Sequence, residues 1–149
     1  MRKVPDHWLW IGNRGDLREP VSIRRAGIAA VVDLAVDELP FTLDRECIVL
    51  RIPLVDGGSG AEAALRLAID SVEHLLRTRI PTLVMCSAGM SRSPSVAAAA
   101  LSRVTDRTPG DWLRDLGPVD VSPALWARVI NALAVGSPAN AKHRMFDDT

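Results

Sequence analysis

Residues 82–94 read TLVMCSAGMSRSP, and this stretch combines a strand, a tight loop and the start of a helix. Residues 82–86 form a short apolar run that predicts a buried strand ending at Cys86. The residues after it are mostly small, as expected for a loop. Ser93 followed by Pro94 is a typical helix start, with serine as N-cap and proline at the first helical position. The stretch therefore predicts a strand–loop–helix unit with a cysteine at the end of its strand.

Other predicted strands and helices alternate along the chain around this unit. Short apolar or β-branched runs predict strands, and apolar residues at helical spacing, with capping signals, predict helices. The expected strands are 8–11, 28–35 and 47–54, and the expected helices are 21–26, 65–76, 96–104, 111–116 and 123–133. Such alternation predicts an α/β fold: one compact domain over residues 1–149, with a central, mostly parallel sheet of four to five strands flanked by helices. Residues 1–6 and 137–149 are expected to be loose tails.

Composition narrows the classes of partner. The chain has 149 residues and 18 basic against 18 acidic side chains, so a broadly basic surface for nucleic acid or acidic lipid is not expected. No apolar run is long enough to span a membrane, so no membrane partner is expected either. Two cysteines, Cys47 and Cys86, are too few for a disulfide scaffold and favour a reducing, cytoplasmic location.

The loop after Cys86 is suited to bind an anion. Small residues let the backbone curl so that successive N–H groups point inward at a helix N-terminus, which is a typical anion site. Gly89 permits the turn, and the planar guanidinium of Arg92 matches two oxygens of a phosphoryl group. The predicted phosphate-binding loop consists of Ser87, Ala88, Gly89, Met90, Ser91 and Arg92.

Cys86 lies at the base of this predicted anion site. Backbone donors and a guanidinium stabilise a thiolate, and a thiolate that faces a bound phosphate is a nucleophile for phosphorus. Ser93 is placed to donate a hydrogen bond to the sulfur and to assist its departure. A free cysteine at a strand end is usually a small buried apolar residue, and that interpretation is kept for Cys47, which lies within an apolar strand.

Residues 84–94 resemble the signature loop of cysteine-dependent protein phosphatases, in particular the dual-specificity group. Residues 9–13 (LWIGN) are similar to the opening strand of that group, and residues 52–56 (IPLVD) to its acid-bearing loop. The resemblance covers most of the chain. It implies a phosphotyrosine protein phosphatase-like fold and a phosphocysteine intermediate, with no metal or other cofactor.

Asp56 is the predicted general acid and base. It precedes Cys86 by 30 positions and one helix, and parallel strands place the loops at their carboxyl ends on the same edge of a sheet. Its position also matches the acid of the family. The leaving oxygen needs a proton, and the resulting carboxylate would then activate water. Alternatively, Asp56 caps the helix that follows. Asp33 and Asp44 are weaker candidates for the acid.

Met85 departs from the family, which usually has histidine immediately before the nucleophile. Methionine cannot donate a hydrogen bond, so weaker activation of Cys86 is expected. No other histidine is an obvious substitute, because His7, His74 and His143 are expected to be solvated.

The predicted function is that of a phosphomonoester hydrolase acting on phosphotyrosine and phosphoserine or phosphothreonine in proteins or peptides. The loop contains no lysine, whereas relatives that act on polyphosphorylated lipids tend to have lysines there, and the short chain leaves little room to wall a deep pocket. Three alternatives remain open: a phosphatase of the same fold acting on a lipid, nucleotide or RNA, a weakly active phosphate-binding pseudophosphatase, and a sulfurtransferase or arsenate reductase. The oligomeric state is left open.

Overall fold

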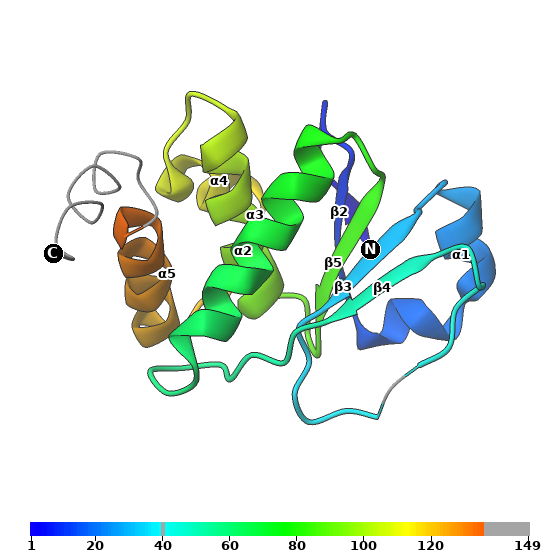
Figure 1. The fold of residues 1–149 in the computed structure, drawn as a ribbon, viewed down its shortest axis with the longest axis horizontal. Helices are drawn as coiled ribbons and strands as arrows, with labels where there is room; N and C mark the ends of the chain where they lie inside the picture. The colour runs from blue at the N-terminus through cyan, green and yellow to red at the C-terminus, as the bar shows by residue number, and fades with distance from the viewer. Residues whose placement is uncertain (40, 136–149) are drawn as a thin grey trace, which may run out of the picture.

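A five-stranded sheet forms the centre of the computed structural model, which describes residues 1–39 and 41–135 (Figure 1). Four neighbouring strands are parallel, and β1 is antiparallel to β2. In spatial order the strands are β1 (Arg2–Lys3), β2 (Leu9–Asn13), β5 (Thr82–Cys86), β3 (Ala30–Asp33) and β4 (Ile48–Arg51). The predicted α/β class and the mostly parallel sheet are confirmed.

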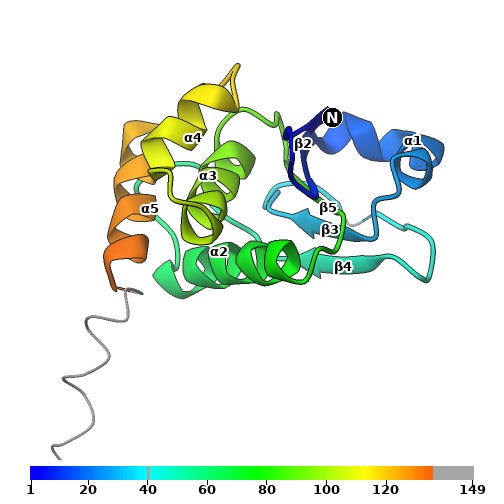
Figure 2. The ribbon, with the colours of Figure 1, turned by 90° about the horizontal axis from the view of Figure 1, so that it is seen from above.

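Helices cover both faces of this sheet (Figure 2). On one face lie the 3-10 helix η1 (Arg14–Arg18) and α1 (Pro20–Arg25), and on the other lie α2 (Glu62–Arg77) and α3 (Arg92–Val104). Two further helices, α4 (Pro109–Asp115) and α5 (Pro123–Val135), pack against α3 on its far side from the sheet. No helix in the described part of the chain is both long and apolar enough to cross a membrane.

The two faces of the sheet belong to two separate apolar clusters, because successive side chains of a strand point to opposite sides. From β5, Val84 and Cys86 join the larger cluster under α2 and α3, and Leu83 and Met85 join the smaller cluster under α1. Cys86 and Met85 therefore lie on opposite sides of the sheet although they are neighbours in sequence.

The register of the strands brings four chain segments to one edge of the sheet. Asn13 pairs with Cys86, and Asp33 pairs with both Met85 and Arg51. The segments that follow β2, β3, β4 and β5 therefore begin at the same level, and in Figure 1 those after β4 and β5 lie below the strands. This is the edge where ligands bind in parallel α/β sheets.

The N-terminal residues are not a loose tail, which corrects the expectation for residues 1–6. Arg2 and Lys3 pair with β2, Val4 is buried in the larger cluster, and the terminal amino group of Met1 lies 2.6 Å from Asp16 Oδ1. A two-residue strand gives little signal in sequence because it is fixed by its partner strand rather than by local pattern. The expected tail at 137–149 lies outside the described residues.

β4 is shorter and more exposed than expected. The predicted strand 47–54 is regular only over Ile48–Arg51, and Ile48 and Val49 are 43 % and 44 % exposed. β4 is the last strand of the sheet, so its side chains have fewer neighbours than those of β3 or β5. Cys47 lies just before β4 and is only partly buried, and it packs against the smaller cluster from outside, so its assignment to the core holds only in part.

Candidate active site

Cys86 is a buried side chain at the carboxyl end of β5, 2 % exposed. Its Sγ accepts a hydrogen bond from the backbone N–H of Gly89 at 3.2 Å and lies 3.3 Å from Ser93 Oγ. The sulfur therefore faces the loop that follows it. The Gly89 N–H donates to the sulfur, whereas either partner can be the donor between the Cys86 and Ser93 side chains.

The loop presents further backbone donors. Within the described residues, the amides of Ala88, Met90 and Ser91 donate to no protein acceptor. They precede the first turn of α3, where the helix dipole adds positive charge. A curled row of free N–H groups beside a helix N-terminus is suited to bind a phosphoryl dianion.

Helix α3 begins two residues earlier than the sequence predicts. Its N-cap is Ser91 and its first residue is Arg92, so Ser93 is not the N-cap. Ser93 instead lies inside the first turn, where its hydroxyl reaches Cys86. Pro94 fits at the third helical position because the first N–H groups of a helix have no acceptor within it.

The Arg92 side chain is buried, and only some of its guanidinium N–H groups have hydrogen-bond acceptors in the described structure. Nη1 donates to the carbonyl of Leu54 at 2.9 Å, and Nη2 donates to Ser87 Oγ at 3.0 Å. The Nε–H is buried and has no acceptor among the described residues. A buried donor without a partner costs about 1–3 kcal/mol, so a ligand oxygen that accepts from Nε is favoured.

Strand β2 supports the loop from the side. Gly89 has a φ of +73°, and a side chain there would meet the carbonyl oxygen of Gly12 at 2.7 Å. The Arg14 N–H also donates to the carbonyl of Ser87 at 3.3 Å. Only glycine at position 89 allows both the left-handed backbone and this close approach. Position 89 therefore requires glycine for two reasons: the predicted turn, and the close approach of the β2 backbone.

Asp56 lies next to the Cys86 loop. Ser91 Oγ donates to Asp56 Oδ1 at 2.7 Å, which joins the predicted acid to the predicted phosphate-binding loop. Asp56 does not cap the following helix, because the N-cap of α2 is Ala61 and has no side-chain cap. This hydrogen bond could not be read from the sequence, since the two residues are 35 positions apart.

The other candidate residues lie away from the sulfur or are used elsewhere. Asp33 is buried and accepts from the Ala35 N–H at 3.0 Å, whereas Asp44 pairs with Arg24 on the surface. His7 packs edge-on against the ring of Trp112. Met90, at the rim of the loop, is 38 % exposed. No cluster of three His, Cys, Asp or Glu side chains suited to a metal occurs in residues 1–39 and 41–135.

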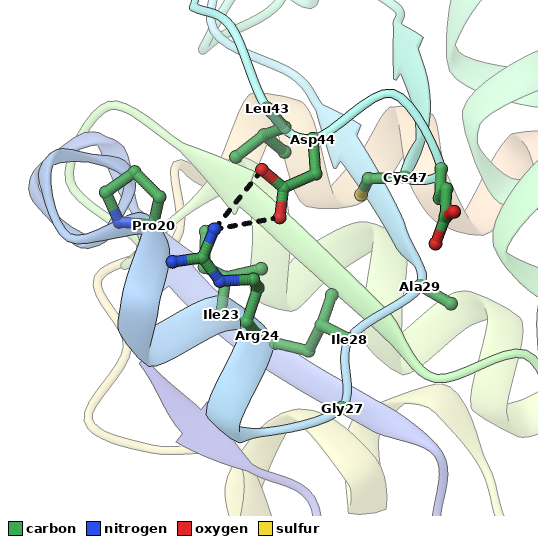
Figure 3. A pocket seen from close by; sticks show the side chains of 10 residues that line it. Pro20, Ile23, Arg24, Gly27, Ile28, Ala29, Leu43, Asp44 and Cys47 are labelled. Carbon is green, nitrogen blue, oxygen red and sulfur yellow. Dashed lines mark hydrogen bonds and ion pairs between the residues drawn. The ribbon is translucent and has the colours of Figure 1, made fainter.

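A hollow of about 410 Å³ lies at the amino ends of the strands, between α1 and the segment before β4 (Figure 3). Its lining includes Ile23, Ala29 and Cys47, together with the ion pair of Arg24 and Asp44. Ala29 comes directly before Ala30, and Ala30 pairs with Thr82, the first residue of β5. Cys86 is the last residue of β5, at the other end of the strand. The hollow is therefore separate from the Cys86 site.

Several solved structures have a similar fold. Human DUSP28 is 21 % identical with a TM-score of 0.77, over 95 % of this chain and 98 % of that chain. DUSP15 is 22 % identical with a TM-score of 0.73, over 95 % and 90 %. PTPMT1 in complex with PI(5)P is 18 % identical with a TM-score of 0.69, over 87 % and 92 %. These likenesses show that the chain has the fold of these proteins.

The chain belongs to the family described as "Polymorphic toxin system, DSP-PTPase phosphatase", whose sequence model matches residues 18–106, more than half of the chain. The match includes Asp56 and the whole Cys86 loop. The predicted resemblance to the dual-specificity group is confirmed. A comparison with curated proteins gives no match.

Proposed function

We propose that this chain hydrolyses phosphate monoesters on proteins or peptides through a phosphocysteine intermediate. The observation that carries the proposal is the 2.7 Å hydrogen bond from Ser91 to Asp56, because it joins a proton donor to the loop of the nucleophile. Family membership supports a phosphatase over a sulfurtransferase or an arsenate reductase. The family description also supports a role in a polymorphic toxin system.

In the first step, the Cys86 thiolate attacks phosphorus while the bond to the leaving oxygen breaks. The leaving oxygen takes its proton from the Asp56 carboxyl group, which becomes a carboxylate. Arg92 supports this step by offering Nε and Nη2 to the equatorial oxygens, whose negative charge the loop amides also stabilise. The alcohol or phenol then leaves.

In the second step, water attacks phosphorus and the S–P bond breaks. The Asp56 carboxylate accepts the proton of the attacking water, and inorganic phosphate is released. The electron pair of the broken bond returns to sulfur, and the Ser93 hydroxyl, 3.3 Å away, stabilises the thiolate that forms. This step restores both Cys86 and Asp56 to their starting states.

The proposed substrates are phosphotyrosine and phosphoserine or phosphothreonine. The loop residues 87–91 carry no charged side chain, which supports a single phosphate rather than a polyphosphorylated headgroup. A lipid phosphate is the second candidate, since PTPMT1, which shares the fold, is seen in complex with PI(5)P. Both cysteines are free thiols, which supports the proposed cytoplasmic location.

The test is turnover of p-nitrophenyl phosphate by the wild type and by Cys86→Ser. Loss of the nucleophile is expected to lower kcat by at least about 10⁴-fold, and Cys47→Ser serves as the matched control. Rapid quenching with a radiolabelled substrate should trap one phosphoryl group per chain in Asp56→Ala. No turnover by the wild type would favour a phosphate-binding pseudophosphatase, as Met85 allows.

Substrate class is tested by comparing kcat/KM on four substrates. These are a phosphotyrosine peptide, a phosphothreonine peptide, a phosphoinositide in mixed micelles and an RNA with a 5′ phosphate. The peptides are expected to be hydrolysed fastest. A preference for the phosphoinositide or the RNA would retain the mechanism and reject the proposed substrate.

A further inference from the structure

We infer that Arg128, on helix α5, is a positioning residue that holds the loop carrying Asp56. This inference rests on the proposed function, because it assigns a role in the same reaction. Arg128 is distant from Asp56 in sequence and lies outside residues 18–106, the part of the chain that matches the family. Its side chain is 12 % exposed and reaches the segment between Asp56 and α2.

Arg128 binds both ends of that segment. Its Nη1 donates to the carbonyl of Gly57 at 3.1 Å and to the carbonyl of Ser59 at 2.6 Å. Its Nε donates to Glu62, the first residue of α2, at 2.7 Å. A planar guanidinium has fixed donor directions, so these contacts define one backbone path directly after Asp56.

The segment needs such support because of its composition. Residues 57, 58 and 60 are glycines, which have the largest backbone freedom to lose on ordering. The Asp56 side chain is held from the other direction by Ser91 at 2.7 Å. Asp56 is thus held by two sets of hydrogen bonds: Ser91 binds its carboxylate, and Arg128 binds the backbone that follows it.

Loss of Arg128 should release the loop without removing α5. That helix is held by the buried side chains of Leu125, Val129 and Ala132, which face the larger apolar cluster. Among the described residues, the sulfur, Arg92 and the loop amides form no hydrogen bond with Arg128. Only the two proton transfers by Asp56 should therefore slow, and a displacement of about 1 Å in such a group costs up to about 10²-fold.

The experiment compares phenyl phosphate, whose leaving group needs a proton, with p-nitrophenyl phosphate, whose leaving group needs one much less. Arg128→Ala is expected to lower kcat/KM, which reports the leaving-group step and not the later hydrolysis of phosphocysteine, about 10- to 100-fold on phenyl phosphate and less than about 3-fold on p-nitrophenyl phosphate. Arg128→Lys keeps the charge beside Glu62 and should show a smaller split of the same kind. In an Asp56→Asn background, Arg128→Ala should cause no further loss, because both changes remove one function.

The matched control is Arg103→Ala. Arg103 also joins two helices by ion pairs, to Asp70 and Glu73, but it does not contact the Asp56 loop. It should affect both substrates equally. An equal loss on both substrates for the two Arg128 variants, or an additive loss in Asp56→Asn, would overturn the inference while leaving the proposed function intact. A wild type without turnover of either substrate would overturn both.

Discussion

Two regions of this molecule contain the same residue types and differ in what those residues can do. At the carboxyl ends of the strands, Cys86 lies with Arg92 and Asp56. At the amino ends of the strands, Cys47 lies with Arg24 and Asp44. The Cys86 sulfur accepts a hydrogen bond from an amide, whereas the Cys47 thiol donates one to the carbonyl of Ile48 at 3.7 Å. The direction of the hydrogen bond distinguishes a candidate thiolate from an ordinary thiol.

The arginines differ in the same way. Arg24 uses one guanidinium nitrogen on both oxygens of Asp44, at 3.1 and 3.3 Å, and both side chains are more than half exposed. This pair satisfies itself, and its contribution to stability is small because water screens it. Arg92 is buried and binds neutral groups, and no carboxylate within residues 1–39 and 41–135 pairs with its positive charge. A site for an anion needs charge that the protein has not already paired.

The largest contrast is expected between Arg92→Lys and Arg24→Lys. Lysine retains the charge but cannot reproduce the two-pronged geometry, so Arg92→Lys should lower kcat on p-nitrophenyl phosphate by about 10²–10³-fold. Arg24→Lys should stay within about 2-fold of the wild type, since surface pairs contribute little. Comparable activity of the two variants would contradict the assignment of the phosphate site.

The next contrast concerns the two aspartates. Asp56→Asn should lower kcat/KM on phenyl phosphate by about 10²-fold, because an amide cannot give up the required proton, and much less on p-nitrophenyl phosphate. Asp44→Asn should leave both substrates unchanged. If Asp56→Asn lowered kcat/KM equally on the two substrates, Asp56 would have no role as the acid.

The two thiols should also differ in alkylation against pH. Burial, and to a lesser extent the Asp44 carboxylate, raise the pKa of Cys47 above its ordinary value of 9.0, so the unreactive thiol persists and its alkylation should still increase above pH 9.0. Cys86 should react with iodoacetate at pH 7 at least about 10-fold faster than Cys47, aided by an anion site for the reagent. Single-thiol variants Cys47→Ser and Cys86→Ser allow each rate to be measured, and equal rates at pH 7 would remove the distinction.

The smallest effect is expected at Met85. Its side chain is fully buried in the smaller cluster under α1, on the other side of the sheet from the Cys86 sulfur. Met85→Leu should therefore change kcat less than about 2-fold. The free energy of unfolding should fall by less than about 1.5 kcal/mol, because the volume is conserved. A large loss of kcat with normal stability would show that this position acts on the sulfur after all.

The features that were predicted from sequence are those set by local pattern. The apolar spacing of α2 and the buried runs of β3 and β5 are visible along a few turns or residues, and the β5–loop–α3 unit is contiguous. Strand order is not local, so the edge position of β4 and the exposure of Ile48 could not be anticipated. The predicted start of α3 at Ser93 is wrong, because the Ser93 hydroxyl contacts Cys86 instead of capping the helix.

Within the candidate site, the residues of one loop were found and their distant partners were not. Cys86, Arg92 and Ser93 lie within eight positions, and the resemblance added Asp56. The contact of Gly12 with the Gly89 turn, the Ser91 tether and the Arg128 contacts each join segments that only the folded chain brings together. None of these contacts has a signature within a single stretch of sequence.

The place of β2 in the sheet has a consequence for how much of the chain makes a working unit. The segment that matches the family begins at residue 18, after β2 has ended at Asn13. A protein trimmed to that segment would turn β5 from an interior strand into an outer one and leave the Gly89 turn without the backbone it rests on. The part of the sequence that is most recognisable is thus smaller than the part that must fold for the cysteine loop to keep its shape.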